Sequence, residues 1–308
     1  MLPTQIDDAS FDALQAQPDA WLPTLQRLAG AHGGGPVRAA GGGSVLVALL
    51  GSDRVLKLYP PFLRDHFAFE RAVLPLLAGR LAVPTPALLA DGEHQGWPYL
   101  LMGQLAGTPM TAAWPALDED QKCALLRSIG ALATQVHALP VPAHLRPLAP
   151  AWADFIARQR LGCAARQQRT GLPAHLLAQL QDFIAGPLPG APGGPAVVLT
   201  GEYTPMNLLV DGARLAGMYD FGDGLLGPRE YDWLGPLCFL AAGQPARCAA
   251  LLQGLGAGVQ VAWDADQRQR LLRLLLLHRY SCLRAQIAHP GWQQAPSFEA
   301  LAELIWGG

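Results

Sequence analysis

The sequence lacks the features that mark several classes of protein. It contains no run of Lys or Arg and its formal net charge is −2, so it offers no electrostatic basis for binding a nucleic-acid backbone. Its densest apolar stretch, LLRLLLLHRY, is interrupted by Arg273 and is too short to span a bilayer. The N-terminus MLPTQIDDAS has no basic segment followed by an apolar one. We therefore expect a cytoplasmic protein without a nucleic-acid or membrane partner.

Cysteine is scarce and scattered. No pair has CxxC spacing, and no His stands beside a cysteine at metal-ligand spacing. Free cysteines are usually buried and behave as small apolar residues. We therefore expect reduced core thiols at all five positions: Cys123, Cys163, Cys238, Cys248 and Cys282.

The length of 308 residues allows two domains, and the patterns change along the chain accordingly. The first part has a helical pattern at 10–29, then short strand patterns separated by GGGS and GSDR, a helical pattern and one more strand. These strands and the helix between them are predicted at 37–40, 45–50, 55–59, 62–74 and 96–107. We expect residues 1–105 to form a domain with a small antiparallel sheet and one main helix.

The remainder, residues 106–308, is predicted to be a second, mostly helical domain. Its clearest helix, within 116–139, begins with the acidic residues Asp118, Glu119 and Asp120, which suit the positive end of a helix dipole. Further helices are predicted at 150–168, 173–185, 230–242, 246–255 and 264–288. The fold class is therefore α+β.

One stretch of the second part, LTGEYTPMNLLVDGARLAGMYDFGDG (199–224), reads as a hairpin that carries polar residues. Asp-Gly between two apolar runs predicts a two-residue loop, which would pair Val210 with Ala213. Strand alternation then places Asn207 and Asp220 on one face, with Glu202 at the same end. An ideal ribbon leaves Asn207 and Asp220 about 13 Å apart, so the chain must bend before Asn207 to bring them together. Such a group of oxygen ligands suits Mg²⁺. The alternative is a surface hairpin whose acids are incidental.

Residues of the first part favour a site for phosphoryl transfer. That chemistry uses a glycine loop over the phosphates, a Lys on the third strand, a helix Glu that holds this Lys, and a catalytic loop with a metal-binding Asp further on. Here GGGS precedes a strand, Lys57 lies in VLKLY, and Glu70 lies in the following helix. By itself Lys57 could be a solvated strand residue, and GGGS is a weak signal, although a Rossmann turn is disfavoured because a strand follows it.

At this point the chain resembles the aminoglycoside phosphotransferase and choline kinase family, which has a two-lobed protein-kinase-like fold. The resemblance covers about 37–240 and rests on VLKLY, LLMGQLAG, the loop that ends at Asn207, and YDFGDG followed by GPREYDW. The family's catalytic loop has His-Gly-Asp where this chain has Thr200, Gly201 and Glu202. By the resemblance, the catalytic residues are Glu202, Asn207 and Asp220, and the last two bind metal.

The resemblance also implies where the nucleotide binds. The backbone of Gly103 and Leu105 should meet adenine, with Met102 behind it, and Asp232 resembles a structural acid of the family. The complete set of implied nucleotide-binding residues is Gly42, Gly43, Ser44, Lys57, Glu70, Met102, Gly103 and Leu105. We expect His137 to be a helix residue that packs against the core. Asp223 could be an acid of a surface turn, or it could assist metal or substrate binding.

The implied reaction is transfer of the γ-phosphoryl group of ATP, or of GTP, to a hydroxyl of a small polar molecule, with Mg²⁺ on the phosphates. A protein acceptor is disfavoured because neither an HRD loop nor a long activation segment closed by APE is present. A cationic acceptor would suit an acidic pocket around Glu202, Asp223 and Glu230. The alternative is a nucleotide-binding pseudokinase that acts through a partner, which Thr200 and Glu202 would explain. The sequence determines neither the acceptor nor the oligomeric state.

Overall fold

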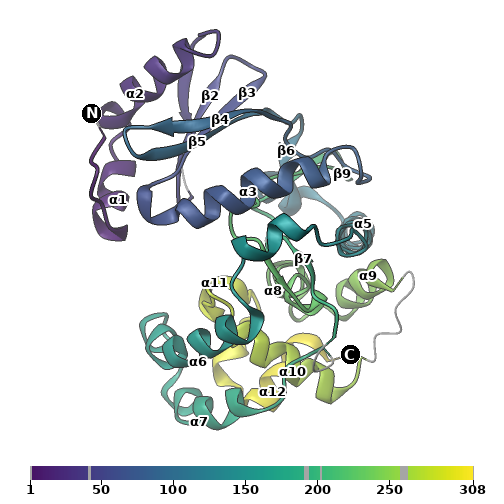
Figure 1. Ribbon diagram of the computed structural model, residues 1–308. Helices are drawn as coiled ribbons and strands as arrows, with labels where there is room; N and C mark the ends of the chain where they lie inside the picture. The colour runs from purple at the N-terminus through teal and green to yellow at the C-terminus, as the bar shows by residue number, and fades with distance from the viewer. Residues whose placement is uncertain (1, 41–42, 191–193, 202, 257–262, 308) are drawn as a thin grey trace. The chain divides into compact units, whose positions relative to one another are not determined.

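The computed structural model describes residues 2–40, 43–190, 194–201, 203–256 and 263–307. They form two compact units, one of Met1–Gly107 with Gly217–Gly224 and one of Thr108–Ala216 with Leu225–Gly308. The α+β class expected from the sequence is confirmed, since one unit is built on an antiparallel sheet and the other is mostly helical (Figure 1). No helix in these ranges is long and apolar enough to cross a membrane.

The first unit contains a five-stranded antiparallel sheet of order β1-β2-β3-β5-β4. Its strands are β1 (Val37–Ala40), β2 (Leu46–Leu50), β3 (Arg54–Leu58), β4 (Leu88–His94) and β5 (Trp97–Gly103). Four of them match predicted strands. The edge strand β4 was not predicted, because its residues alternate between half-buried and exposed and include Asp91, Gly92 and Glu93, so they give a weak apolar pattern.

Helices cover both faces of this sheet. The expected helix at 10–29 is two helices, α1 (Asp8–Gln15) and α2 (Pro18–Gly30). Pro18 is the first residue of α2, a position at which proline is favoured. Side chains from both helices, including Phe11, Trp21 and Leu25, pack on the sheet in a buried core with Leu46 and Leu56. Strand alternation directs Lys57 to the opposite face, which α3 (Arg64–Leu77) covers.

The second unit is built around helices with two small sheets. Strand β7 (Val197–Leu199) pairs with β10 (Leu225–Gly227), and β8 (Leu208–Asp211) lies between β6 (Thr108–Pro109) and β9 (Arg214–Met218). The helices are α4 (Met110–Ala113), α5 (Glu119–His137), α6 (Trp152–Arg169), α7 (Ala174–Ala185), α8 (Leu234–Phe239), α9 (Pro245–Leu255), α10 (Ala265–Leu276), α11 (Leu283–Gln286) and α12 (Phe298–Trp306).

The helical predictions for this unit need correction in two regions. Of the helix expected at 230–242, α8 covers only Leu234–Phe239. The helix expected at 264–288 ends at Leu276, and only the short α11 follows; both parts are rich in apolar and helix-forming residues, so no glycine or proline marks the break. Helix α12 was not predicted. By contrast, α5 begins where the acidic residues indicated, with the side chain of Asp118 accepting the backbone N–H of Gln121.

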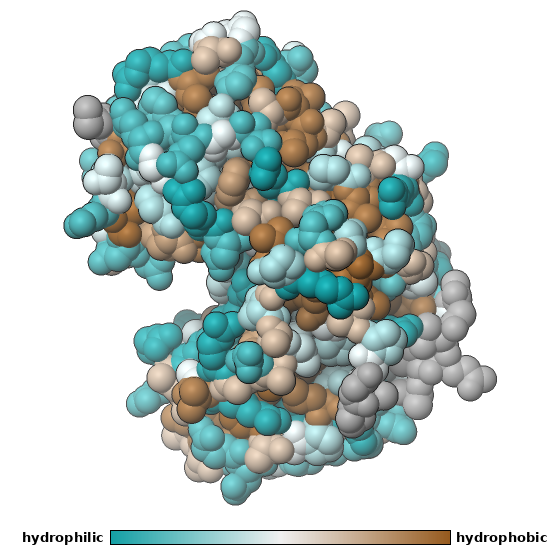
Figure 2. Space-filling model, in the orientation of Figure 1, coloured by the Kyte–Doolittle hydropathy of each residue, from teal (hydrophilic) through white to brown (hydrophobic). Residues whose placement is uncertain are grey.

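The hydrophobic residues are mostly internal. All five cysteines are free, as expected. Cys163, Cys238 and Cys248 are buried, whereas Cys123 and Cys282 are only partly buried, so the expectation of core thiols holds for three of the five. The large apolar side chains that remain exposed lie on separate elements, namely Phe62, Leu89, Leu161, Met206, Tyr280 and Leu304. Figure 2 accordingly shows hydrophobic residues interspersed with hydrophilic ones on the face it presents.

Candidate functional site

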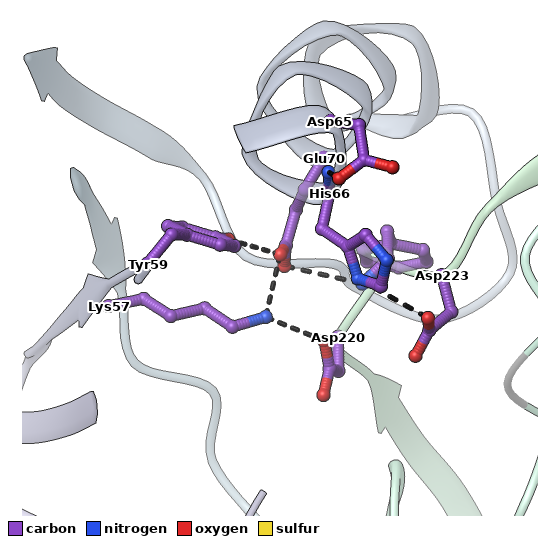
Figure 3. Close-up of polar contacts among 8 residues, drawn as sticks. Lys57, Tyr59, Asp65, His66, Glu70, Asp220 and Asp223 are labelled. Carbon is purple, nitrogen blue, oxygen red and sulfur yellow. Dashed lines mark hydrogen bonds and ion pairs between the residues drawn. The ribbon is translucent and has the colours of Figure 1, made fainter. Parts of the chain in front are cut away.

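Lys57 of β3 lies at the centre of a buried cluster in the first unit. Its Nζ is 2.6 Å from Glu70 Oε2 and 2.6 Å from Asp220 Oδ1. The Glu70 side chain is 1% exposed and that of Lys57 is 8% exposed, whereas that of Asp220 is 38% exposed. Figure 3 shows the three side chains converging from a strand, a helix and the segment that follows β9. The structure thus brings together three of the residues expected in the site.

Electrostatics keep this lysine charged. Burial by itself lowers the pKa of Lys57, but the carboxylates of Asp220 and Glu70 outweigh burial and raise it above its ordinary value. Lys57 is therefore a cation at neutral pH. Its ammonium group is held by hydrogen bonds to both carboxylates, so it can present a fixed positive charge to a phosphate.

The Glu70 carboxylate accepts hydrogen bonds from three groups. Besides Lys57, the hydroxyl of Tyr59 donates to Glu70 Oε2 and the backbone N–H of Phe221 donates to Oε1 at 3.2 Å. Burial, followed by the charge of Glu70, raises the pKa of Tyr59 well above its ordinary value, so the hydroxyl remains a donor. A buried carboxylate with three donors costs far less than an unpaired one. Glu70 thereby links β3, α3 and the Asp220 segment.

Asp220 has an unusual backbone conformation, with a φ of +69°. The left-handed region costs most L-residues about 1–2 kcal/mol, although Asp and Asn tolerate it best. The following turn is packed closely on α3, because a Cβ at position 224 would lie 1.9 Å from a ring carbon of Phe69. Only glycine fits at that position, which explains part of the Asp-Phe-Gly-Asp-Gly sequence. Such local strain is typical of functional segments.

The donor set suits a hard cation. The Asp220 carboxylate supplies oxygen and is partly open to solvent. Within the described residues, no group of three or more His, Cys, Asp and Glu side chains is arranged to hold a metal ion. A metal held here would take one or two protein oxygens and complete its shell with phosphate oxygens and water, as Mg²⁺ does.

The expected nucleotide-binding residues of the glycine loop and β5 also lie in the first unit. Gly43 has a φ of +91°, and its carbonyl accepts a hydrogen bond of 2.8 Å from Gln15 Nε2. Gly42 lies outside the described residues, and Ser44 follows Gly43 in the loop. On β5, Met102 is buried and the N–H of Gly103 donates to Ala87 O at 2.9 Å.

This bond of Gly103 limits what the residue can offer to a base. Because its N–H is used by the protein, its carbonyl is the backbone group left for an adenine donor. Leu105, two residues beyond the end of β5, is half-buried. The contact of Gly103 and Leu105 with adenine stays a prediction.

The second unit holds the loop with the altered triplet. The carboxylate of Asp232 is 0% exposed and accepts the backbone N–H of Thr200 at 3.2 Å and of Gly201 at 2.7 Å. His137 Nε2 lies 2.8 Å from the same carboxylate. His137 is packed, as expected, and it also helps to hold Asp232. Asp232 therefore fixes the backbone at the start of this loop.

The structure describes only one of the two candidate catalytic residues in this loop, Asn207. Asn207 is 8% exposed, and its N–H donates to Thr204 O at 3.1 Å, which closes a turn before β8. Glu202 lies outside the described residues. The roles of Asn207 as a metal ligand and Glu202 as a catalytic residue stay predictions.

The predicted hairpin turn is displaced by one residue. Asp211 is the last residue of β8 and Arg214 the first of β9, so the loop is Gly212 and Ala213. The expected pairing of Val210 with Ala213 is therefore wrong. Gly212 has a φ of +57°, and hairpin loops with glycine at the first position need that freedom there.

Sequence reasoning missed two side chains of the cluster. Tyr59 lies two residues after Lys57 in the motif VLKLY, so the side chains of both residues point to the same face of the sheet. His66 lies one helical turn before Glu70, and its Nδ1 is 3.3 Å from Asp223 Oδ1. Strand and helix periodicity could have placed both residues near Glu70, but neither could have shown their partners.

Comparisons with known proteins agree with this arrangement. The sequence model described as "Phosphotransferase enzyme family" matches residues 37–276. The chain also resembles the GDP complex of wild-type aminoglycoside 2'-phosphotransferase-IIIa, with 19% identity, a TM-score of 0.64, and 87% of this chain and 91% of that chain covered.

Two further solved structures are similar. One is the streptomycin-ATP-APH(2″)-IIa ternary complex, with 16% identity, a TM-score of 0.62, and 82% of this chain and 89% of that chain covered. The other is a macrolide 2'-phosphotransferase from Brachybacterium faecium, with 21% identity, a TM-score of 0.61, and 86% and 98% of the two chains covered. These similarities establish a shared fold.

Proposed function

Because the chain belongs to the phosphotransferase enzyme family, we propose that it transfers the γ-phosphoryl group of ATP, or of GTP, to a hydroxyl of a small polar acceptor. The observation that carries this proposal is the contact of the buried Lys57 with both the buried Glu70 and the partly exposed Asp220. It supplies a fixed cation for phosphate beside a carboxylate suited to Mg²⁺. Two of the similar structures contain ATP or GDP, which supports a purine nucleotide as donor.

Each residue has a defined part in this proposal. Lys57 binds phosphate oxygens, and Glu70 keeps its ammonium group in place. Asp220 and Asn207 supply oxygens to Mg²⁺, which would neutralise phosphate charge when bound. Glu202 accepts the proton of the acceptor hydroxyl while the oxygen of that hydroxyl bonds to the γ-phosphorus. The bond between the γ-phosphorus and the oxygen that bridges it to the β-phosphate breaks, which releases the nucleoside diphosphate.

A longer carboxylate in the catalytic loop is compatible with this role. Glu202 has one methylene more than the aspartate usual in the family, which moves its carboxylate by about 1 Å and could cost about a hundredfold in rate if the loop did not adjust. Asp232 holds the loop through the backbone of Thr200 and Gly201, so this anchor does not depend on which side chains those positions carry.

The test is a screen of ATP and GTP consumption with Mg²⁺ across aminoglycosides, macrolides, amino alcohols and sugars. We expect nucleoside diphosphate release that depends on one acceptor class, and Glu202→Gln should lower that turnover by about a hundredfold with nucleotide affinity nearly unchanged. Tight nucleotide binding without turnover on any acceptor would contradict the proposal and indicate a binding protein instead.

A further inference from the structure

The turn that follows Asp220 has two polar anchors on α3. On its N-terminal side, the N–H of Phe221 donates to Glu70 Oε1 at 3.2 Å. On its C-terminal side, the carboxylate of Asp223 lies 3.3 Å from His66 Nδ1. The turn itself is closed by the N–H of Gly224, which donates to Phe221 O at 3.2 Å. Figure 3 shows both anchors on the same helix.

The two anchors occupy one face of the helix. His66 and Glu70 are four residues apart on α3, so they are neighbours one turn apart. The two side chains of the C-terminal anchor are largely shielded from solvent, because His66 is 12% and Asp223 is 15% exposed. The turn approaches closely between them, since a Cβ at Gly222 would meet Glu70 Oε2 and His66 Cβ at 3.4 Å.

Lys57 holds the Asp220 carboxylate directly. The buried Phe221 ring and the close packing at Gly224 hold the turn on α3. The contact of Asp223 with His66 adds a second polar anchor beyond Phe221, which narrows the orientations that the turn can take. Asp220 has its left-handed φ immediately before the turn, so its side-chain direction depends on how the turn is held. Asp223 is the first acid after Asp220 and is placed to supply this second anchor.

We propose that His66 and Asp223 are a positioning pair that holds the turn on α3 and thereby sets the direction of the Asp220 carboxylate. This inference rests on the proposed function, because the carboxylate is positioned for a magnesium nucleotide. Because a carboxylate oxygen accepts hydrogen bonds, His66 Nδ1 is the donor atom of the proposed pair. Neither residue is a catalytic residue, since both act through Asp220.

The test measures how strongly Mg²⁺ tightens nucleotide binding. The dissociation constant of ADP is measured by calorimetry in EDTA and in Mg²⁺, and the ratio of the two values is the metal coupling. His66→Ala should lower this ratio about tenfold, which corresponds to about 1.4 kcal/mol, while the value in EDTA stays unchanged. His66→Asn should keep the ratio within about twofold, because its side-chain amide can donate from nearly the position of Nδ1.

Further variants separate positioning from general damage to the helix. Arg71→Ala is the matched control, since Arg71 lies on α3 but its exposed side chain pairs with Asp91 at 2.8 Å, and it should keep the wild-type ratio. Asp223→Ala should reproduce the effect of His66→Ala. The double variant should lose no more than either single variant, because the pair acts as a unit.

The outcomes distinguish this inference from the proposed function. If wild-type protein binds no nucleotide with or without Mg²⁺, both fail. If it binds with metal coupling that His66→Ala and Asp223→Ala leave intact, only the positioning pair is refuted. The same follows if His66→Asn loses as much coupling as His66→Ala. Should His66→Ala fail to fold, Asp223→Ala and His66→Asn decide the question by the same ratio.

Discussion

Asp220 combines a carboxylate suited to metal with a left-handed backbone, and these two properties can be separated by substitution. Asparagine tolerates a positive φ about as well as aspartate, so Asp220→Asn should leave the turn unchanged while removing the charge. Alanine removes the carboxylate and also strains the backbone.

We expect Asp220→Asn to lose metal-dependent nucleotide binding and to lower Tm only through the lost charge of the ion pair with Lys57. Asp220→Ala should lose the same binding and also about 1 kcal/mol of stability from the left-handed conformation. Calorimetric titration of ADP with and without Mg²⁺, together with thermal unfolding, checks both. Retention of full metal-dependent binding by Asp220→Asn would show that another residue holds the metal.

Tyr59 is the other residue whose role is open to a direct test. Tyr59→Phe keeps the ring that packs against Phe67 at 5.5 Å but removes the donor to the buried Glu70 carboxylate. The variant should lose about 1.5–3 kcal/mol of unfolding free energy, the range for hydrogen bonds to charged groups. Urea denaturation measures this loss.

Tyr99→Phe is the matched control for that measurement. Its hydroxyl lies 3.0 Å from a ring nitrogen of His32 rather than from a carboxylate. The expected loss is therefore smaller, about 0.5–1.5 kcal/mol. Equal losses in the two variants would mean that Tyr59 contributes nothing particular to the environment of Glu70.

At the scale of elements, α5 and α9 approach each other through glycine. A Cβ at position 254 would lie 2.2 Å from Arg127 O, and one at position 130 would lie 2.6 Å from Leu251 O. Both contacts involve the backbone of the facing helix, which cannot move aside as a flexible side chain can. The spacing of these helices is thus set by two residues without side chains.

We expect Gly254→Ala to destabilise the second unit by about 1–3 kcal/mol, the usual cost of overpacking. Gly162→Ala is the control, because Gly162 lies in α6 with nothing closer than 3.8 Å to its missing Cβ. That variant should stabilise the protein by about 0.4–1 kcal/mol through helix propensity and reduced unfolded-state entropy. Denaturant unfolding that shows no difference between the two would contradict the close packing.

The same two helices are also joined by an exposed ion pair. Arg247 of α9 donates to both oxygens of Glu119 at the start of α5, at 2.8 and 2.6 Å. These hydrogen bonds, followed by that from Lys122, lower the pKa of Glu119 from its ordinary 4.5 to about 2. A lowered pKa in the folded state means that the stabilisation is complete above pH 4.5 and disappears as the pH falls towards 2.

Thermal unfolding of Glu119→Gln beside the wild type tests this dependence. At pH 7 and low salt the wild type should have the higher Tm, and the difference should shrink between pH 4.5 and 2. Because the Glu119 side chain is 61% exposed, the difference should be small and should also decrease in high salt. A difference that does not change with pH would argue against the ion pair.

At the scale of the whole molecule, two separate segments of the chain form the first unit. Residues Gly217–Gly224 belong to that unit although more than a hundred residues of the second unit precede them. The N–H of Met218 donates to Pro84 O at 3.2 Å, and Phe221 and Asp220 bond to α3 and β3. The segment that carries Asp220 is thus held by contacts within the first unit.

A nucleotide that binds the folded protein at the proposed site should stabilise it. Ligand at a hundred times its dissociation constant adds about 2.7 kcal/mol to the free energy of unfolding. We expect a rise in Tm with ATP or GTP in Mg²⁺ and a smaller rise in EDTA. The absence of any shift with every combination of purine nucleotide and metal would refute the kinase-like interpretation.

The sequence by itself determined the local features of this protein. Strands β1, β2, β3 and β5 follow from apolar patterns bounded by glycine, and α5 from its acidic start, because these signals arise between neighbouring residues. The order of Lys57, Glu70, Asn207 and Asp220 along the chain also pointed to phosphoryl transfer, and the family match is consistent with it.

Only the tertiary structure decided which groups meet. Glu70 accepts hydrogen bonds from Lys57, Tyr59 and Phe221. Asp223 contacts His66, which lies 157 positions earlier in the sequence. Contacts at that separation depend on how the sheet, α3 and the Asp220 turn pack, and no local pattern encodes them. The local pattern also misplaced the turn at Gly212 and the end of α10, because apolar spacing fixes element boundaries only loosely.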